Sequence, residues 1–148
     1  MIRTAAPQDE AAIRQCARRA YEGYIPLMGR EPAPMAADFA AQIAAGLAYV
    51  YLGENGAVQG YIVFYPQNGH MLLESVAVLP EAADRGIGKA LIAFCEAEAR
   101  RLRLNAVCLY TNEKMTANLS IYPRLGYTET GRRTEDGFRR VFFEKRLS

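Results

Sequence analysis

The stretch LLESVAVLPEAADRGIGKAL, residues 72–91, decides the fold of this chain. It begins as an apolar, β-branched run, which is typical of a buried strand, and Pro80 ends that run. The glycine-rich turn at residues 85–88 follows, and a helix-forming run begins at Lys89. In such a layout, backbone N–H groups and a helix N-terminus can hold a phosphate. A plain strand-to-helix turn has the same pattern, so the rest of the chain must decide between the two interpretations.

Length and composition bound the class of protein. With 148 residues, of which 51% are hydrophobic and 23% charged, the chain is predicted to form one domain, residues 1–148. The formal net charge of +2 is too small to indicate a nucleic-acid partner. No apolar run approaches the roughly 20 residues of a membrane span, and the polar N-terminus lacks a signal-peptide core. We therefore expect a cytoplasmic protein that binds neither nucleic acid nor a membrane.

The three cysteines, Cys16, Cys95 and Cys108, lie in apolar surroundings, and none belongs to a CxxC pair. This pattern favours buried free thiols. The chain has a single histidine, His70, and its cysteines are scattered, so we expect no metal site. A covalent route through Cys95 or Cys108 lacks a partner residue nearby in the sequence, and core packing is the favoured role for both.

The order of expected elements indicates a mixed α/β (α+β) fold, a central mixed sheet of six to seven strands flanked by about four helices. Helices are expected from residue 7 onward, at 36–45, from 88 to about 102, and at 115–125. Strands are expected at 2–4, 47–53, 57–65, 72–79, 106–109, 127–130 and 138–145. The pair Asn55-Gly56 predicts a hairpin. The helical crossover before residue 106 predicts a parallel pairing with the central strand.

Residues 21–35 contain three prolines, two glycines and two tyrosines, which predicts a shaped loop. One interpretation is a connector whose tyrosines pack on the core. The other is a substrate-binding loop with Tyr21, Tyr24 and Arg30 at the mouth of a pocket, where the guanidinium would meet a carboxylate or phosphate. The sequence leaves both interpretations open.

Two separated motifs carry a resemblance to a known family. The first consists of Val76-Ala77-Val78, Pro80 and the run RGIGKAL at 85–91, and the second of Asn118, Tyr122 and LGY at 125–127. In this order and with these elements, the chain resembles the acetyl-CoA-binding core of the GNAT N-acetyltransferase superfamily along essentially its whole length. The resemblance implies the fold of those acyl-CoA N-acyltransferases. It also implies transfer of acetyl from acetyl-CoA directly to an amine of a small molecule, peptide or protein.

The resemblance also implies roles for individual residues. The backbone of Val76, Ala77 and Val78 would pair with the pantetheine arm as an added strand. The pyrophosphate would meet the amides of Arg85, Gly86, Ile87, Gly88, Lys89 and Ala90, a role consistent with the helix dipole. Asn118 would bond the polar arm of acetyl-CoA, and a cap or surface role is the alternative. Tyr122 would protonate the departing thiolate, with a core tyrosine as the alternative.

The chain departs from the family pattern at one point. The family usually has Gln or Arg at the position of Ala83 and often glycine at the position of Asp84. An acid therefore lies near the expected pyrophosphate, although Arg85 and Lys89 can offset it. This departure is the only support for an alternative function, a non-catalytic acetyl-CoA-binding regulatory domain of the same fold.

Acetyl transfer needs a neutral amine, and an amine with a pKa near 10.4 is deprotonated only about once in 10³ at pH 7. A base therefore helps. Glu74, just before the pantetheine segment, is the best-placed carboxylate, and an exposed edge or ion-pair role is its alternative. His70 is a second candidate because histidine titrates near neutral pH. A main-chain N–H near Val76 or Ala77 would meet the oxyanion. The acceptor, the acyl-chain preference and the oligomeric state, including a homodimer, stay open.

Overall fold

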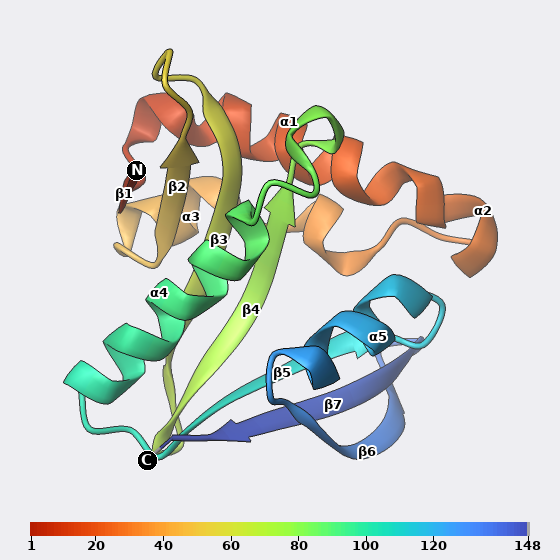
Figure 1. Cartoon of the computed structure of the whole chain (residues 1–148). Coiled ribbons are helices and arrows are strands. Elements are labelled where there is room, and N and C mark those ends of the chain that lie inside the picture. The colour runs from red at the N-terminus through yellow and green to blue at the C-terminus, as the bar shows by residue number, and fades with distance from the viewer. Residues whose placement is uncertain (148) are drawn as a thin grey trace. The chain divides into compact units, whose positions relative to one another are not determined.

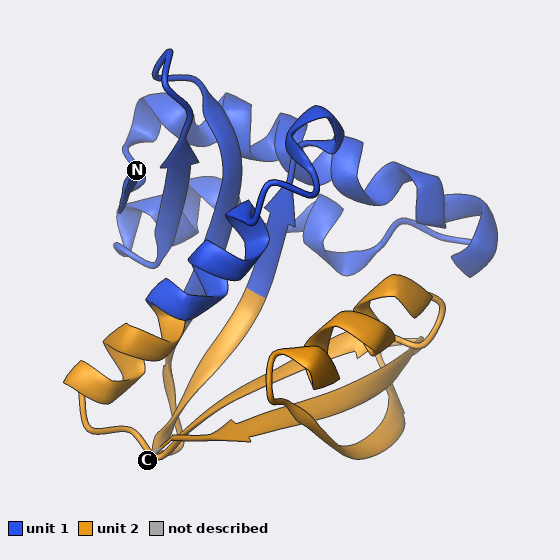
Figure 2. Cartoon of the chain, in the orientation of Figure 1, with its two compact units in different colours: residues 1–64, 75–94 blue, residues 65–74, 95–148 orange. Residues whose placement is uncertain are grey.

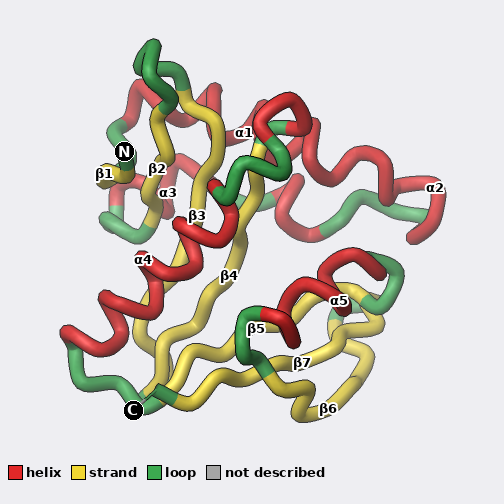
Figure 3. The backbone as a smooth tube through the Cα atoms, in the orientation of Figure 1, coloured by secondary structure: helices red, strands yellow, loops and turns green. Residues whose placement is uncertain are grey.

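The computed structural model describes residues 1–147, and its seven strands form one sheet in the order β1-β2-β3-β4-β5-β7-β6 (Figure 1). The strands are β1 (Ile2–Thr4), β2 (Ala48–Leu52), β3 (Val58–Gln67), β4 (His70–Val78), β5 (Ala106–Asn112), β6 (Thr128–Glu135) and β7 (Phe138–Arg146). The helices, shown in red in Figure 3, are α1 (Glu10–Tyr21), α2 (Ile25–Met28), α3 (Phe39–Ala44), α4 (Ile87–Arg101) and α5 (Thr116–Arg124). The predicted mixed α/β class is confirmed, and so is the parallel pairing of β4 with β5.

The chain divides into two compact units, which Figure 2 shows in different colours. Unit 1 comprises residues 1–64 and 75–94, and unit 2 comprises residues 65–74 and 95–148. The strands β3 and β4 and the helix α4 each contribute residues to both units. The single domain expected from the length of the chain stays a prediction.

In unit 1, helices cover both faces of β3. The ring of Tyr61 contacts Phe39 of α3, with centroids 5.5 Å apart, and the ring of Phe64 contacts Phe94 of α4 at 6.0 Å. Successive strand residues point to opposite faces, so α3 and α4 lie on opposite sides of this strand. Residues 61–64 of β3 are all buried, as expected for a strand covered on both faces.

A glycine on β3 allows the start of α4 to lie close to the sheet. A Cβ at Gly60 would lie 3.0 Å from the carbonyl oxygen of Ala77 and 3.3 Å from side-chain atoms of Ile87 and Leu91. A larger residue would push the strand away from both neighbours. The absence of a side chain at residue 60 therefore brings the first turn of α4 against β3 and β4.

Unit 2 buries a charged network. The Glu96 carboxylate of α4 accepts a hydrogen bond from the Tyr127 hydroxyl at 2.9 Å and another from Lys145 Nζ of β7 at 3.0 Å. Glu96 is 7% exposed. Burial raises the pKa of Tyr127, and the neighbouring Glu96 charge raises it further. The network ties α4, β7 and the residue before β6 together within this unit.

We expect Lys145→Met to lower the free energy of unfolding by about 3 kcal/mol, because it leaves a buried carboxylate without its cation. Urea denaturation would measure the change. The matched control is Arg146→Met on the same strand, whose side chain is 80% exposed and 3.4 Å from Glu144. That exposed pair should contribute less than about 1 kcal/mol. Equal losses in the two variants would contradict the structural role of the network.

The segment expected to be an irregular loop, residues 21–35, is largely helical, so that prediction is wrong for much of its length. Tyr21 is the last residue of α1, and a 3₁₀ turn at Glu22–Tyr24 leads into α2. Proline is tolerated in the first turn of a helix, where Pro26 lies. Gly29, with φ +73°, ends α2 in the left-handed conformation.

Several predicted boundaries also shift. The helix expected from residue 36 begins at 39, because the Asp38 carboxylate caps it by accepting the Ala41 N–H at 3.0 Å. Strand β5 continues beyond residue 109 because it pairs with β7 as far as Asn112 opposite Arg140. The hairpin of β6 and β7 turns at Asp136 and Gly137, so β6 is longer than expected. Backbone pairing with β7 thus continues these strands into polar residues, which the local apolar pattern did not include.

Candidate active site

The turn between β4 and α4, in unit 1, has the geometry of an anion cradle. Gly86 adopts φ +78°, a conformation that favours glycine, and a Cβ there would have no atom within 4 Å. The Ala90 N–H donates to the Gly86 carbonyl at 3.0 Å. The N–H groups of the preceding first turn have no acceptor inside the helix. These donors therefore point out of the helix N-terminus, next to the exposed residues Arg85, Gly86 and Lys89.

Asp84 adopts φ +64° in the same turn, where the family pattern often has glycine. Aspartate tolerates the left-handed region better than most residues, at some cost in free energy. Its position near the N-terminus of α4 is favourable for the helix dipole and unfavourable for a second anion. The departure from the family pattern therefore leaves the backbone conformation of the turn intact.

We expect Asp84→Gly to tighten acetyl-CoA binding about five-fold, because an exposed charge near a helix end contributes up to about 1 kcal/mol. Calorimetric titration would measure the affinity, and the gain should shrink at high salt. The matched control is Asp136→Gly, since Asp136 also has a left-handed backbone, with φ +52°, but lies in the β6–β7 hairpin. An equal gain in the control variant would assign the effect to the backbone or to the overall charge.

The peptide groups of β4 in unit 1 have defined directions. The Leu79 N–H donates to the Gln59 carbonyl of β3 at 2.9 Å. Because peptide directions alternate along a strand, the Ala77 N–H points toward β3, and the Val76 N–H and carbonyl point to the opposite edge. In agreement, the Tyr21 hydroxyl donates to the Val76 carbonyl at 2.7 Å. Of the two residues considered for an oxyanion donor, only Val76 has its N–H on the edge away from β3.

The three residues expected at the acceptor site lie close together in sequence in unit 1. Tyr21 is buried, and its hydroxyl bonds the strand that is expected to hold pantetheine. Tyr24 is half-buried in the following 3₁₀ turn, and Arg30 is exposed just beyond α2. The structure thus places Tyr21 against β4.

Glu74 lies in unit 2 beside two tyrosines that sequence reasoning missed. The Tyr65 hydroxyl of β3 donates to Glu74 Oε1 at 2.9 Å. Burial, with the Glu74 hydrogen bond second, raises the pKa of Tyr65 to about 12. The pKa of Tyr110 is also raised, mainly by burial. The Glu74 charge adds to this increase, and the Arg140 guanidinium opposes it. The Asn68-Gly69 turn between β3 and β4 is the sequence signal that could have linked Tyr65 to Glu74. Tyr110 reaches them only through the parallel pairing of β4 with β5.

Asn118 and Tyr122 lie on α5, also in unit 2. The Asn118 side-chain amide donates to the Thr111 hydroxyl of β5 at 3.0 Å. Tyr122 is 6% exposed, and burial raises its pKa to about 12. Its ring packs against those of Tyr127 and Phe143, with centroids 5.8 and 5.7 Å apart. The phenol is therefore rigidly held and protonated throughout the neutral pH range.

Glu74 and Tyr122 are associated with opposite faces of the unit 2 sheet. Glu74 interacts electrostatically with Tyr110 of β5, and Tyr110 is paired with Phe142 of β7. Arg140 lies two residues before Phe142, on the same face of the sheet, and its guanidinium stacks over the Tyr110 ring at 4.3 Å. Tyr122 contacts the next residue of β7, Phe143, on the other face. The structure therefore does not bring the candidate base and the candidate acid into contact with each other.

The other residues considered for chemistry have structural positions. All three thiols are free, and burial raises the pKa of Cys16 to about 12 and that of Cys108 to about 11, so neither is a ready nucleophile. Burial also raises the pKa of Cys95. His70 is half-buried at the start of β4. Within residues 1–147, no group of three or more His, Cys, Asp or Glu residues could hold a metal ion. No helix in this range is long and apolar enough to cross a membrane.

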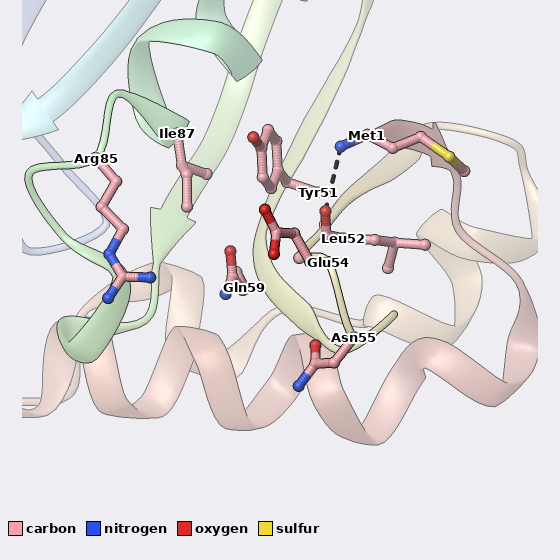
Figure 4. Close-up of a pocket in the computed structure, with 9 residues that line it drawn as sticks. Met1, Tyr51, Leu52, Glu54, Asn55, Gln59, Arg85 and Ile87 are labelled. Atoms are coloured by element: carbon pink, nitrogen blue, oxygen red, sulfur yellow. Dashed lines mark hydrogen bonds between the residues drawn. The ribbon is translucent and has the colours of Figure 1, made fainter.

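A surface pocket of about 690 Å³ lies in unit 1 beside the glycine-rich turn. Figure 4 shows the Arg85 guanidinium on one side, with the polar ends of Gln59, Glu54 and Tyr51 across from it. The pocket is lined by Met1, Tyr51, Leu52, Gly53, Glu54, Asn55, Gln59, Arg85 and Ile87. It therefore borders the turn, but the residues expected to pair with pantetheine do not line it.

The glycine turn that opens onto the N-terminus of α4 has the layout of a phosphate-binding turn. The model of the acetyltransferase (GNAT) family matches residues 11–127, across both units. The chain belongs to this GNAT acetyltransferase family. A search of curated proteins found no match.

Solved structures of low sequence identity share the fold. A PaiA N-acetyltransferase from Thermoplasma acidophilum, in complex with coenzyme A, has a TM-score of 0.79 and 17% identity, over 99% of this chain and 98% of that one. The ribosomal-protein-S18-alanine N-acetyltransferase from Escherichia coli has a TM-score of 0.77 and 20% identity, over 100% and 94%. A nourseothricin acetyltransferase has a TM-score of 0.62 and 22% identity. It covers 67% of this chain, which spans only 64% of its length. The expected GNAT fold is confirmed.

Proposed function

We propose that this chain is an N-acetyltransferase that moves acetyl from acetyl-CoA directly to an amine. The observation that carries the proposal is the turn before α4, where a left-handed Gly86 leads into N-terminal amides that have no acceptor inside the helix. A Cβ at Gly88 would meet only Val78 Cγ2, at 3.7 Å, so the main chain stays approachable there. These features fit a pyrophosphate.

The proposed binding residues divide by the part of acetyl-CoA that they hold. The outward peptide edge of β4 pairs with pantetheine, with Val76, Ala77 and Val78 as the residues involved. The amides from Arg85 to Ala90 hold the pyrophosphate, and the cationic side chains of Arg85 and Lys89 add charge. Asn118 donates to Thr111 through its amide nitrogen, so its oxygen serves as the acceptor for the polar arm.

The proposed chemistry divides between three groups of this chain. Bound acetyl-CoA supplies the activated acetyl group as a thioester. Glu74 takes a proton from the acceptor ammonium, the Val76 N–H stabilises the negative charge on the acyl oxygen, and Tyr122 gives its proton to the leaving sulfur. Burial supports the last role because it raises the pKa of Tyr122 to about 12 and keeps the phenol protonated.

The acceptor side is proposed to include Tyr21, Tyr24 and Arg30. The printed names of two similar structures refer to a ribosomal-protein alanine and to the antibiotic nourseothricin, so both protein and small-molecule amines are acceptors to test. Tyr21 links this segment to β4 through its bond to the Val76 carbonyl. A cytoplasmic location and a homodimer stay predictions.

Two measurements together test the proposed function. Calorimetric titration with acetyl-CoA reports binding, and a free-thiol assay with a panel of small-molecule and peptide amines reports transfer. Binding with amine-dependent release of thiol is expected. Binding without such release across the panel would favour the regulatory alternative, and no binding would contradict the assigned cradle.

A further inference from the structure

We propose that Tyr65 is a positioning residue that orients the Glu74 carboxylate to receive the proton of the acceptor amine. The inference rests on the proposed function, in which Glu74 is the base. The proton passes from the ammonium nitrogen to a Glu74 carboxylate oxygen, and the amine lone pair then forms the bond to the acetyl carbon. Tyr65 keeps its own proton throughout.

The geometry within unit 2 carries this assignment. Tyr65 is near the end of β3 and Glu74 is on the adjacent strand β4, and both are half-buried. The Tyr65 O–H donates to Glu74 Oε1 at 2.9 Å, which is within the range of a good hydrogen bond. A carboxylate offers about four lone-pair sites, so a bond to one oxygen leaves capacity for a proton. The bond to a stiff aromatic side chain thus limits the rotation of a flexible glutamate.

Tyr65 remains a donor over the whole neutral range. Burial raises its pKa to about 12, and the hydrogen bond and charge of Glu74 contribute after burial. Tyr110 on β5 also interacts with Tyr65 and with Glu74. Tyr110 in turn interacts with Arg140 on β7 and with Glu135 and Asp136 in the β6–β7 hairpin. Arg140 is held by Glu135 at 3.0 Å and stacks on Tyr110. The Tyr65 hydroxyl is therefore a fixed, uncharged donor to Glu74.

The hydrogen bond sets the expected effect of removing the hydroxyl. Without its donor, the Glu74 side chain loses the orientation that directs an oxygen toward the acceptor ammonium. In Tyr65→Phe, kcat should therefore fall about ten-fold, the effect of one hydrogen bond to a charged group. The KM for the amine and the affinity for acetyl-CoA should not change, because the variant leaves the binding groups in place.

The experiment compares three variants with the wild-type protein. Tyr65→Phe removes only the hydroxyl. Glu74→Gln removes the base, and we expect it to lower turnover by about 10²-fold or more while acetyl-CoA still binds. Tyr49→Phe is the control, because Tyr49 is also a half-buried strand tyrosine but lies on β2 in unit 1, where its ring stacks on Phe64. Its kcat and KM should match those of the wild type.

The outcomes separate this inference from the proposed function. An unchanged kcat in Tyr65→Phe, together with an inactive Glu74→Gln, would overturn the role of Tyr65 and leave the base assignment standing. Wild-type turnover in Glu74→Gln would overturn both roles of the pair. In either case, amine-dependent transfer by the wild-type protein would still support the proposed acetyltransferase function.

A measurement on the wild-type protein keeps the test independent of how the variants fold. The carboxyl ¹³C resonance of Glu74 can be assigned by its loss in the spectrum of Glu74→Gln, or by residue-specific labelling. It should show a solvent-deuterium isotope shift from the proton that Tyr65 donates. The absence of that shift would overturn the inference.

Discussion

The Gly86→Glu variant is expected to lose acetyl-CoA affinity by about 100-fold or more, because juxtaposing like charges costs several kcal/mol. The added carboxylate would lie where the N-terminal amides of α4 are proposed to hold the pyrophosphate. A Cβ at Gly86 meets no atom within 4 Å, so the side chain has room in the free protein. The loss should therefore appear in binding more than in folding, and calorimetric titration would measure it.

A matched glycine separates charge at the cradle from strain in the backbone. Gly46, which follows α3, has φ +75° against +78° for Gly86, and a Cβ there also meets no atom within 4 Å. Gly46→Glu carries the same backbone strain and the same new charge elsewhere in unit 1. It should show a similar loss of thermal stability and an unchanged affinity. Retained affinity in Gly86→Glu would show that the glycine turn holds no acetyl-CoA.

The Tyr122→Phe variant should lower turnover by about 10²- to 10³-fold, which is typical for the loss of a general acid. Burial raises the pKa of Tyr122 to about 12, so the phenol is protonated at neutral pH and can donate to a leaving thiolate. Phenylalanine keeps the ring contacts with Tyr127 and Phe143. We therefore expect acetyl-CoA affinity and thermal stability close to the wild type, with the loss confined to kcat.

The neighbouring Tyr127 provides the control for Tyr122. Tyr127→Phe removes the hydroxyl that donates to the buried Glu96 carboxylate at 2.9 Å. It should lower the free energy of unfolding by about 1–3 kcal/mol, the cost of a broken buried hydrogen bond. Its turnover, measured on the folded fraction with the free-thiol assay, should stay near the wild type. Unchanged turnover in Tyr122→Phe would remove that residue from the mechanism.

Local sequence patterns predicted most of the elements that carry the site. The β4 strand, the glycine turn and α4 follow one another over residues 70–101. Each has a local cause: an apolar run that a proline ends, a pair of glycines, and a run of helix-forming residues. The Asn55-Gly56 pair lies in the turn between β2 and β3, as expected. Prediction failed over residues 21–35, where prolines in first turns were compatible with short helices.

The amino-acid sequence by itself determined the order of the strands and the glycine turn, because these depend on neighbours within a few residues along the chain. It also determined the family, through two motifs in a fixed order. Only the tertiary structure decided which groups meet across strands. The bond from Tyr21 to Val76 and the ion pair of Glu96 with Lys145 join residues far apart in sequence. The interaction of Tyr110 with Glu74 depends on the parallel pairing of β4 with β5, whose register no local motif specifies. Packing and strand pairing set these contacts, because they join groups that are not neighbours along the chain.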